Sequence, residues 1–325
     1  MAPNRERPSS RETPVPITPQ HVAASSIDLV RLNFNPQAQL GLSLVLALVM
    51  FGIALDLTRD DFRQAWARPR ALVIGLLSHH VLYPAATFLM IVLLRPAPSI
   101  GLGMLLVASC PAGHISNFFT HRANGNTALS VSISTLSTLG AIVMTPLNVS
   151  FWASRDPEMA ALLHSFSLDP ARMLLEVGLL LCLPLALGLL VQARAPALAK
   201  RLHVPMKRFS MLVFLVFVLG ALALNWAIFL EWGRYVVLLV LAHNALALAG
   251  GYTFARLAGL AERDCRAVAF ETGIQNSGLG LVLIFNFFDG LGGMAIVTSW
   301  WGIWHIAAGT GLSTFWLMRD RRRLA

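Results

Sequence analysis

Nine long apolar runs, separated by short polar loops, are the feature that most constrains how this chain folds. They cover residues 39–58, 71–94, 99–121, 126–148, 170–192, 209–230, 234–258, 265–288 and 293–318. Each is close to the ~20 residues that a helix needs to cross the hydrocarbon of a bilayer. Backbone groups inside a bilayer must be hydrogen-bonded within the protein, which favours helices for these runs. The sequence therefore predicts an all-α polytopic membrane protein with about nine transmembrane helices.

The composition agrees with a membrane protein. Of the 325 residues, 56% are hydrophobic and 13% are charged, and the mean hydropathy is +0.66. These values exclude a chain that is disordered throughout and disfavour an ordinary soluble domain. A net charge of +9 would suggest nucleic acid in a soluble protein, but here the basic residues lie in short loops. We therefore expect a lipid bilayer, and no nucleic acid, as the partner.

The basic residues are distributed unevenly between alternate loops, which predicts the orientation. The side that holds the loops 59–70, 193–208 and 256–266 and the C-terminus carries 17 of the 25 lysines and arginines. By the positive-inside rule, the N-terminus lies outside and the basic C-terminus 319–325 lies in the cytoplasm. The predicted location is the inner (plasma) membrane, as a multi-pass protein.

Residues 1–38 differ from the rest of the chain because they are polar and rich in proline. They contain no apolar segment of the kind that a signal peptide requires. They are predicted to form a disordered N-terminal tail.

Nothing in the sequence indicates catalysis. Cys110, Cys182 and Cys265 are far apart and show no metal-ligand spacing. No Ser/His/Asp or paired-carboxylate arrangement is present. We expect no enzyme activity, no cofactor, no metal other than a coupling ion, and no obligatory protein partner.

One apolar run contains a carboxylate. Residues 270–285 read FETGIQNSGLGLVLIF and hold Glu271, Gln275 and Asn276 among three glycines. A carboxylate at membrane depth costs roughly 2.5 kcal/mol or more, so it is usually kept to face a cavity and a cation. Glycines weaken the run as a regular helix. A polar, glycine-broken helix is typical of the ion and substrate site of a secondary transporter.

A second run has a similar centre. Residues 109–117 read SCPAGHISN and resemble 271–278, ETGIQNSG, in combining polar residues with glycine. Each is followed closely by another helix. If the two are counterparts in inverted repeats, each repeat has five helices and the first repeat has lost its first one.

Three motifs carry a resemblance to a known family. They are CPAGHISNFFTHRANGNTALSVSISTLSTLGAIVMTPL (110–147), ETGIQNSGLG (271–280) and MFGIALDLTRDDF (50–62). In this order and spacing they resemble the bile acid:sodium symporter (BASS) family, and the chain is identified as a bacterial member of it.

The resemblance implies a fold for residues 39–318, the transporter domain. It has two inverted repeats, a core domain and a panel domain, and two broken helices, 99–121 and 265–288, that cross in the core. The panel would hold 39–58, 170–192 and 209–230. The core would hold 71–94, 99–121, 126–148, 234–258, 265–288 and 293–318.

The resemblance also implies two sodium sites. The first would use Ser116, Asn117, Ser130, Ser134 and Glu271. Na⁺ is a hard cation that prefers oxygen ligands, and Ser130 and Ser134 share one helix face. The alternative is that these serines bond only to the backbone of their own helix.

The second sodium site would use Glu271, main-chain carbonyls around Thr272 and Ile274, Gln275, and a position where the family has Gln and this chain has His79. A neutral imidazole is a poorer Na⁺ ligand than an amide oxygen, but it can carry a proton. Coupling to one or two Na⁺, or to Na⁺ and H⁺, is therefore open. The alternative for His79 is a buried histidine that only packs between helices.

The substrate positions implied by the resemblance are His114, Asn276 and Ile306. His114 and Ile306 depart from the family pattern, which argues against a bile acid as the natural substrate. The predicted function is sodium-coupled symport of a small organic anion, a carboxylate or sulfonate, by alternating access. The alternatives are a proton-coupled or uncoupled exporter of organic anions, and a membrane sensor that binds a ligand without moving it.

Overall fold

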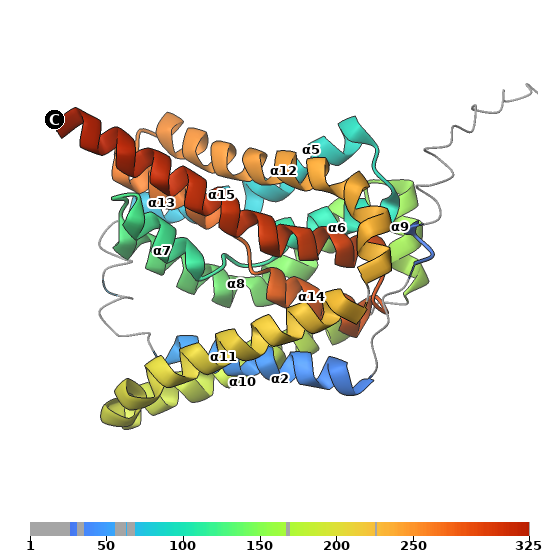
Figure 1. Cartoon of the computed structure of the whole chain (residues 1–325), viewed down its shortest axis with the longest axis horizontal. Coiled ribbons are helices and arrows are strands. Elements are labelled where there is room, and N and C mark those ends of the chain that lie inside the picture. The colour runs from blue at the N-terminus through green and yellow to red at the C-terminus, as the bar shows by residue number, and fades with distance from the viewer. Residues whose placement is uncertain are drawn as a thin grey trace, which may run out of the picture.

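The computed structural model describes residues 27–30, 36–55, 63, 69–166, 170–224 and 226–324 (Figure 1). Within these residues all regular structure is helical, as predicted, with one isolated bridge between two extended residues. The helices are α2 (Pro36–Ala54), α4 (Pro69–Leu77), π-helix η1 (Ser78–Leu82), α5 (Tyr83–Leu94), α6 (Pro98–Ser109), α7 (Ile115–Arg122), α8 (Thr127–Ala153), α9 (Pro157–Ser165), α10 (Pro170–Arg194), α11 (Pro196–Leu224), α12 (Trp226–Leu257), α13 (Glu262–Gly273), α14 (Ser277–Phe287) and α15 (Gly292–Leu324).

Proline marks the start of many of these helices. The helices α2, α4, α6, α9, α10 and α11 all have proline as their first residue. The first N–H groups of a helix have no partner within it, so a residue without an N–H costs nothing there, and its fixed φ suits the helix. These prolines thus help to fix where each helix begins.

The helices form two groups that face each other in Figure 1. The helices α2, α10 and α11 pack against one another, and they meet the rest through α2 against α14 and α10 against α8. In the larger group, α12 packs along α13 and α15, and α6 packs on α8 and α15. The smaller group consists of the three helices assigned above to the panel. The panel, the core and the inverted repeats stay predictions.

Three helices of the described part of the chain are long and apolar enough to cross a membrane, namely Pro69–Leu94, Thr127–Ala153 and Val236–Leu257. Two other predicted spans are each divided into two shorter helices, α6 with α7 and α13 with α14. Neither α6 nor α13 exceeds 12 residues, or about 18 Å at 1.5 Å per residue, so neither crosses a bilayer alone. The count of nine spans stays a prediction.

Some segments expected to be loops are helical. Residues 150–170 hold the end of α8 and the short helix α9, whose first turn is capped by the Asp156 side chain. The predicted loop 193–208 is mostly the start of α11, and the C-terminal residues 319–324 continue α15. Helix caps and tertiary packing extend these helices beyond the apolar segments that were predicted to cross the membrane. Neither can be inferred from the positions of the apolar runs.

Most of the predicted N-terminal tail, residues 1–26 and 31–35, lies outside the described residues. The part that is described is packed on the helices. Ile27 is buried, the Asp28 carboxylate accepts a hydrogen bond from Ser99 N at 2.9 Å, and Val30 O accepts one from Gly292 N at 2.8 Å. Residues 27–30 therefore join the starts of α6 and α15.

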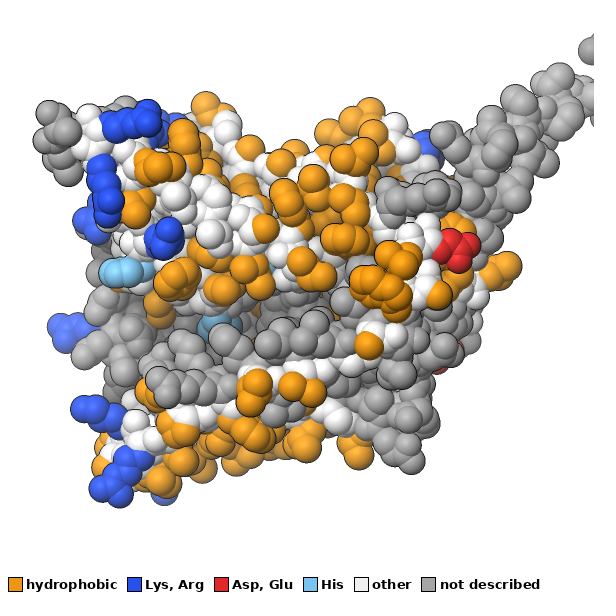
Figure 2. Space-filling view, viewed as in Figure 1, with side chains coloured by type: hydrophobic (Ala, Val, Ile, Leu, Met, Phe, Trp, Pro, Cys, Tyr) orange, Lys and Arg blue, Asp and Glu red, His pale blue; other side chains and the backbone are white. Residues whose placement is uncertain are grey.

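Charges gather at the two ends of the molecule (Figure 2). Most of the lysines and arginines that this view shows lie at the end on the left. Hydrophobic side chains are numerous on the visible surface between the ends, as expected of a surface in contact with lipid.

Candidate functional site

The two broken helices meet at their breaks. Ala112, between α6 and α7, forms an antiparallel bridge with Gln275, between α13 and α14. Gly113 N donates to Ile274 O at 2.7 Å, and Asn276 N donates to Pro111 O at 2.9 Å. The extended residues of each break thus supply hydrogen bonds that the other has lost, which makes the crossing possible in the interior of the protein.

Glycine is favoured at the two breaks because neighbouring groups approach closely, the backbone of the other break at Gly113 and a side chain of α12 at Gly273. A Cβ on Gly113 would lie 2.9 Å from Gln275 O. A Cβ on Gly273 would lie 2.3 Å from a methyl carbon of Leu248. The glycines of both motifs therefore allow contact as well as weakening the helix.

Hydroxyl groups of α8 bind the remaining free backbone groups of the first break. The Ser137 hydroxyl accepts from Ala112 N at 3.1 Å, and the Thr145 hydroxyl donates to Ser109 O at 2.6 Å. At the second break, the Asn244 side chain donates to Gly273 O at 2.7 Å. These side chains replace the partners that a continuous helix would provide.

Glu271 lies next to the crossing and is fully buried. Ser116 donates to its Oε1 at 2.6 Å, Ser134 donates to its Oε2 at 2.6 Å, and Ser130 also donates to Oε1. The oxygen of the same Ser130 hydroxyl lies 2.7 Å from the Asn117 side-chain oxygen. The cluster formed by Ser116, Asn117, Ser130, Ser134 and Glu271 thus combines residues of α7, α8 and α13.

In this candidate ion-binding cluster, the other four residues gather around one buried carboxylate. Glu271 has no salt-bridge partner among the described residues. A buried charge is normally paired or binds a cation. The cluster presents carboxylate, hydroxyl and amide oxygens, which are the ligands that a hard cation prefers. The serines are therefore directed at Glu271 and not only at their own backbone.

His79 lies on the other side of Glu271, at its backbone. Its Nδ1 is 2.8 Å from Glu271 O and its Nε2 is 2.9 Å from Cys110 O. Both ring nitrogens thus face carbonyl oxygens near the C-terminal ends of α6 and α13. A neutral imidazole has one N–H and donates to only one of the two carbonyls.

A π-helical turn places His79 in this position. Pro84 has no N–H to donate to the carbonyl four residues earlier, at His80. Asn148 of α8 donates to His80 O instead, at 3.0 Å, and Tyr83 N donates to Ser78 O, five residues back. The wider π turn follows from the proline, and such turns are frequent at functional sites.

Comparison with known proteins agrees with this architecture. The family model described as "Sodium Bile acid symporter family" matches residues 43–232, more than half of the chain. The chain belongs to the sodium bile acid symporter family. The match ends before α13, so the half of the crossing that carries Glu271 lies outside the residues it covers.

Relatives extend the similarity to most of the chain. An uncharacterised sodium-dependent transporter of Bacillus subtilis is 29% identical over 285 residues, 87% of this chain and 85% of the relative. A probable sodium/metabolite cotransporter of Arabidopsis thaliana chloroplasts is 30% identical over 75% of this chain and 58% of its own length. The human ileal sodium/bile acid cotransporter is 28% identical over 73% of this chain and 67% of its own length. The protein is thus a membrane transporter and not an enzyme.

The residues that family resemblance assigned to a second sodium site lie around the second break. The Thr272 carbonyl accepts from the Gln275 side chain at 2.8 Å, and the Ile274 carbonyl accepts from Gly113. The Gln275 Oε1 atom is buried without a hydrogen-bond partner among the described residues. These groups lie next to His79 and Glu271, and their role as sodium ligands stays a prediction.

Of the three predicted substrate residues, two lie at the crossing and one lies on a neighbouring helix. His114 is the N-cap of α7. The Asn276 side chain caps α14 by accepting from Leu279 N at 3.1 Å. Ile306 is 44% exposed on α15, one turn after Gly302, where an added Cβ would meet Ser277. His114 and Asn276 thus start the two half-helices that leave the crossing, while Ile306 lies on a neighbouring helix.

The structure also adds polar groups to the site that the sequence analysis missed. The Thr120 and Ser130 hydroxyl oxygens lie 3.1 Å apart, and Ser78 is hydrogen-bonded to Thr272 at 2.8 Å. Thr120 lies one turn after Ser116 on α7, so the i, i+4 spacing was a usable signal. No sequence pattern indicated that Ser78 and Thr272 meet.

Proposed function

We propose that this protein is a secondary active transporter that couples import of a small organic anion to Na⁺. The observation that carries the proposal is Glu271, a buried carboxylate held by three serines of α7 and α8 with no cationic side chain bonded to it among the described residues. The named relatives support sodium coupling, since all three names describe sodium-dependent transport or cotransport, of a metabolite in one and of bile acid in another.

In this proposal Na⁺ binds within the ion-binding cluster. Glu271 neutralises its charge, while the serine hydroxyls rotate to present lone pairs and Asn117 presents its amide oxygen. One carboxylate suffices for a monovalent ion without binding it too tightly for release. Because the ligands come from both broken helices and α8, Na⁺ binding would stabilise the crossing in one arrangement.

The substrate would bind at the same crossing, beside His114 and Asn276. The N-termini of α7 and α14 begin there, and helix N-termini favour the negative charge of a carboxylate or sulfonate. Alternating access would move the group formed by α2, α10 and α11 against the rest, exposing the crossing to each side in turn.

A proton-coupled transporter is the second candidate, and His79 favours it. Its two ring nitrogens lie within 2.9 Å of two carbonyl oxygens. Only an imidazolium donates to both. In that case the proton on His79 would be the coupling cation, and it would take the place of the second Na⁺.

Transport in proteoliposomes tests these candidates. Labelled taurocholate and a set of smaller carboxylates and sulfonates would be offered under an inward Na⁺ gradient, an inward H⁺ gradient, or neither. We expect accumulation of at least one anion with Na⁺ alone. Accumulation with H⁺ alone would favour the second candidate. Binding of an anion without transport under any gradient would favour a sensor.

The orientation is also part of this proposal, with the N-terminus outside the cell membrane and the C-terminus in the cytoplasm. In a Cys182→Ser background, which removes the exposed native thiol, Arg5→Cys and Arg322→Cys variants would be exposed to an impermeant thiol reagent in intact cells. We expect labelling at position 5 only, and labelling of both after the cells are opened. Labelling at 322 alone in intact cells would reverse the orientation.

A further inference from the structure

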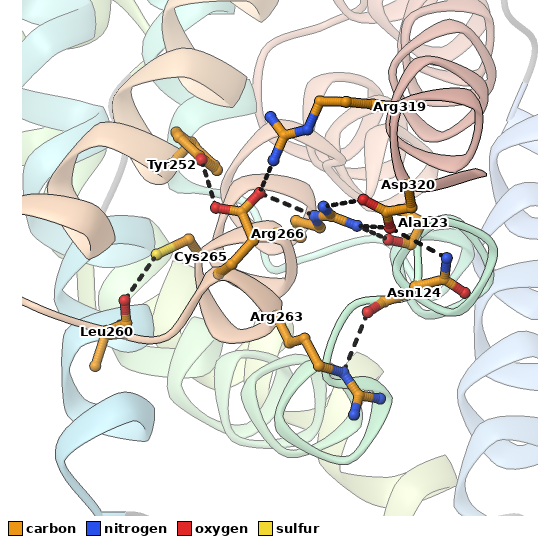
Figure 3. Close-up of polar contacts among 10 residues, drawn as sticks. Ala123, Asn124, Tyr252, Leu260, Arg263, Cys265, Arg266, Arg319 and Asp320 are labelled. Atoms are coloured by element: carbon orange, nitrogen blue, oxygen red, sulfur yellow. Dashed lines mark hydrogen bonds and ion pairs between the residues drawn. The ribbon is translucent and has the colours of Figure 1, made fainter. Parts of the chain in front are cut away.

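A buried arginine lies at the basic end of the crossing helix α13. The side chain of Arg266 is only 4% exposed. It donates to both carboxylate oxygens of Asp320 on α15, from Nη1 at 2.6 Å and from Nη2 at 2.8 Å, and from Nε to Glu262 at 3.1 Å. Figure 3 shows this guanidinium at the centre of the polar contacts. Two parallel hydrogen bonds to one carboxylate fix the orientation of a guanidinium as well as its position.

Arg266 also binds the other crossing helix. Its Nη1 donates to Ala123 O, at the C-terminal end of α7, at 2.6 Å. The turn that follows α7 is attached to α13 as well, because Asn126 N donates to Arg263 O at 2.9 Å and the Asn126 side chain donates to Asp264 at 2.6 Å. The end of α7, the start of α8 and the start of α13 are therefore held together at one place.

These three helices are the ones that supply the ion-binding cluster. Ser116 and Asn117 lie on α7, Ser130 and Ser134 on α8, and Glu271 on α13, five residues after Arg266. At 1.5 Å per residue that is about 7.5 Å along the helix. A shift of α13 against α7 and α8 would therefore separate the Glu271 carboxylate from the serines that contact it.

Packed aromatic rings fill the distance between the arginine and the cluster. The guanidinium lies 5.5 Å from the Trp316 ring. Trp316 contacts Phe270 with ring centroids 5.4 Å apart, and Phe270 contacts Phe119 at 5.9 Å. Phe270 precedes Glu271, and Phe119 lies on α7 between Ser116 and Thr120. Densely packed rings transmit a displacement instead of absorbing it.

We propose that Arg266 is a positioning residue for the ion-binding cluster and that Asp320 holds Arg266 in place. The inference rests on the proposed function, because it takes Glu271 and the three serines as ligands of the coupling ion. Arg266 does not touch the ion. It sets the distance between the helices that do, in the way that outer-shell partners orient the ligands of a metal.

The bond to Asp320 persists at every physiological pH. Hydrogen bonds from Arg266 lower the pKa of the Asp320 carboxyl well below its usual range. A carboxyl whose pKa is lowered on folding stabilises the protein above its ordinary pKa, and this contribution is lost only as the pH falls through the lower value. The positioning contact is therefore constant across the pH range in which transport is measured.

Asp320→Asn tests the proposal. Asp320 is 23% exposed, and without its charge Arg266 keeps its bond to Glu262, so the variant is expected to fold, but the guanidinium is no longer fixed on Ala123 O. In Na⁺-free buffer we expect faster hydrogen exchange in peptides covering 113–121 and 268–276. The Na⁺ concentration that gives half-maximal thermal stabilisation should rise by roughly tenfold, as for loss of an outer-shell partner. Asp320→Glu, which keeps the carboxylate, should restore both values toward wild type.

Arg319→Gln is the matched control. Arg319 belongs to the same group of charges and donates to Glu262 at 2.8 Å, but this bond does not reach α7. The variant should leave both measurements unchanged. Unchanged exchange at 113–121 and 268–276 in Asp320→Asn would overturn the inference, even if the variant were less stable. A wild-type protein without any response to Na⁺ would instead overturn the proposed function, and the exchange measurement would still decide the role of Arg266.

Discussion

Glu271→Gln is expected to abolish the Na⁺ dependence of both thermal stability and uptake. Glutamine keeps the shape of the side chain but supplies no charge, and its NH₂ group meets serine hydroxyls that now donate to a carboxylate. Loss of charge-assisted contacts at a buried site costs on the order of 3 kcal/mol, which weakens Na⁺ binding about 100-fold or more. The measurement is the unfolding temperature in detergent, compared between NaCl and choline chloride. The difference between the two salts is the Na⁺-dependent stabilisation that the variant should lose.

The same variant should be no less stable than wild type when Na⁺ is absent. Without the ion, Glu271 is a buried carboxylate with no cationic side chain bonded to it in the described part of the chain, and removing such a charge relieves a desolvation cost. Glu158→Gln is the matched control because Glu158 is an exposed carboxylate on α9, away from the crossing. It should retain the full response to Na⁺. A wild-type response in Glu271→Gln would mean that Glu271 is not an ion ligand.

The two breaks could be predicted from the residues because their chemistry is local, whereas the crossing of the two helices was implied only by the family resemblance. A carboxylate, two amides and three glycines inside an apolar run weaken a regular membrane helix and so predict a break there. The polar, Gly-containing centre at 109–117 has the same pattern. Both runs are indeed broken, after Ser109 and after Gly273. The i, i+4 spacing of Ser130 and Ser134 correctly placed both hydroxyls on one face, toward Glu271. The ion that the cluster binds stays a prediction.

The charges at the basic end were not predictable in the same way. Arg266 and Asp320 are far apart in sequence; Arg266 was counted only as one of the basic residues of the loop 256–266, and Asp320 was not singled out in the sequence analysis. Their pairing depends on how α13 and α15 pack, which hydropathy does not report. The π turn is an intermediate case. A proline inside a helical run, such as Pro84, disturbs the helix, but it was not used in the sequence analysis, and the structure shows that the disturbance turns His79 toward two carbonyls.

His79→Gln is expected to strengthen Na⁺ binding and to make it cooperative. The imidazole now occupies the space between Glu271 O and Cys110 O, near the Gln275 side-chain oxygen, which has no hydrogen-bond partner within the described ranges. An amide at position 79 can donate to one carbonyl and turn its own oxygen toward the space that the ring leaves. The backbone carbonyls, the Gln275 side chain and the introduced amide would then form a second oxygen-rich site that shares Glu271 with the first.

Two Na⁺ ions bound to one carboxylate and one pair of broken helices would be coupled, because each stabilises the same arrangement of the crossing. We therefore expect the apparent Na⁺ affinity to rise roughly fivefold or more and the Hill coefficient to rise from about one toward two. Na⁺-dependent thermal stabilisation measures both. His80→Gln is the matched control, since His80 lies on the same π turn and its ring faces no hydrogen-bond partner among the described residues. If both variants lower the unfolding temperature and leave the Na⁺ curve unchanged, His79 only packs between helices and the second site does not exist.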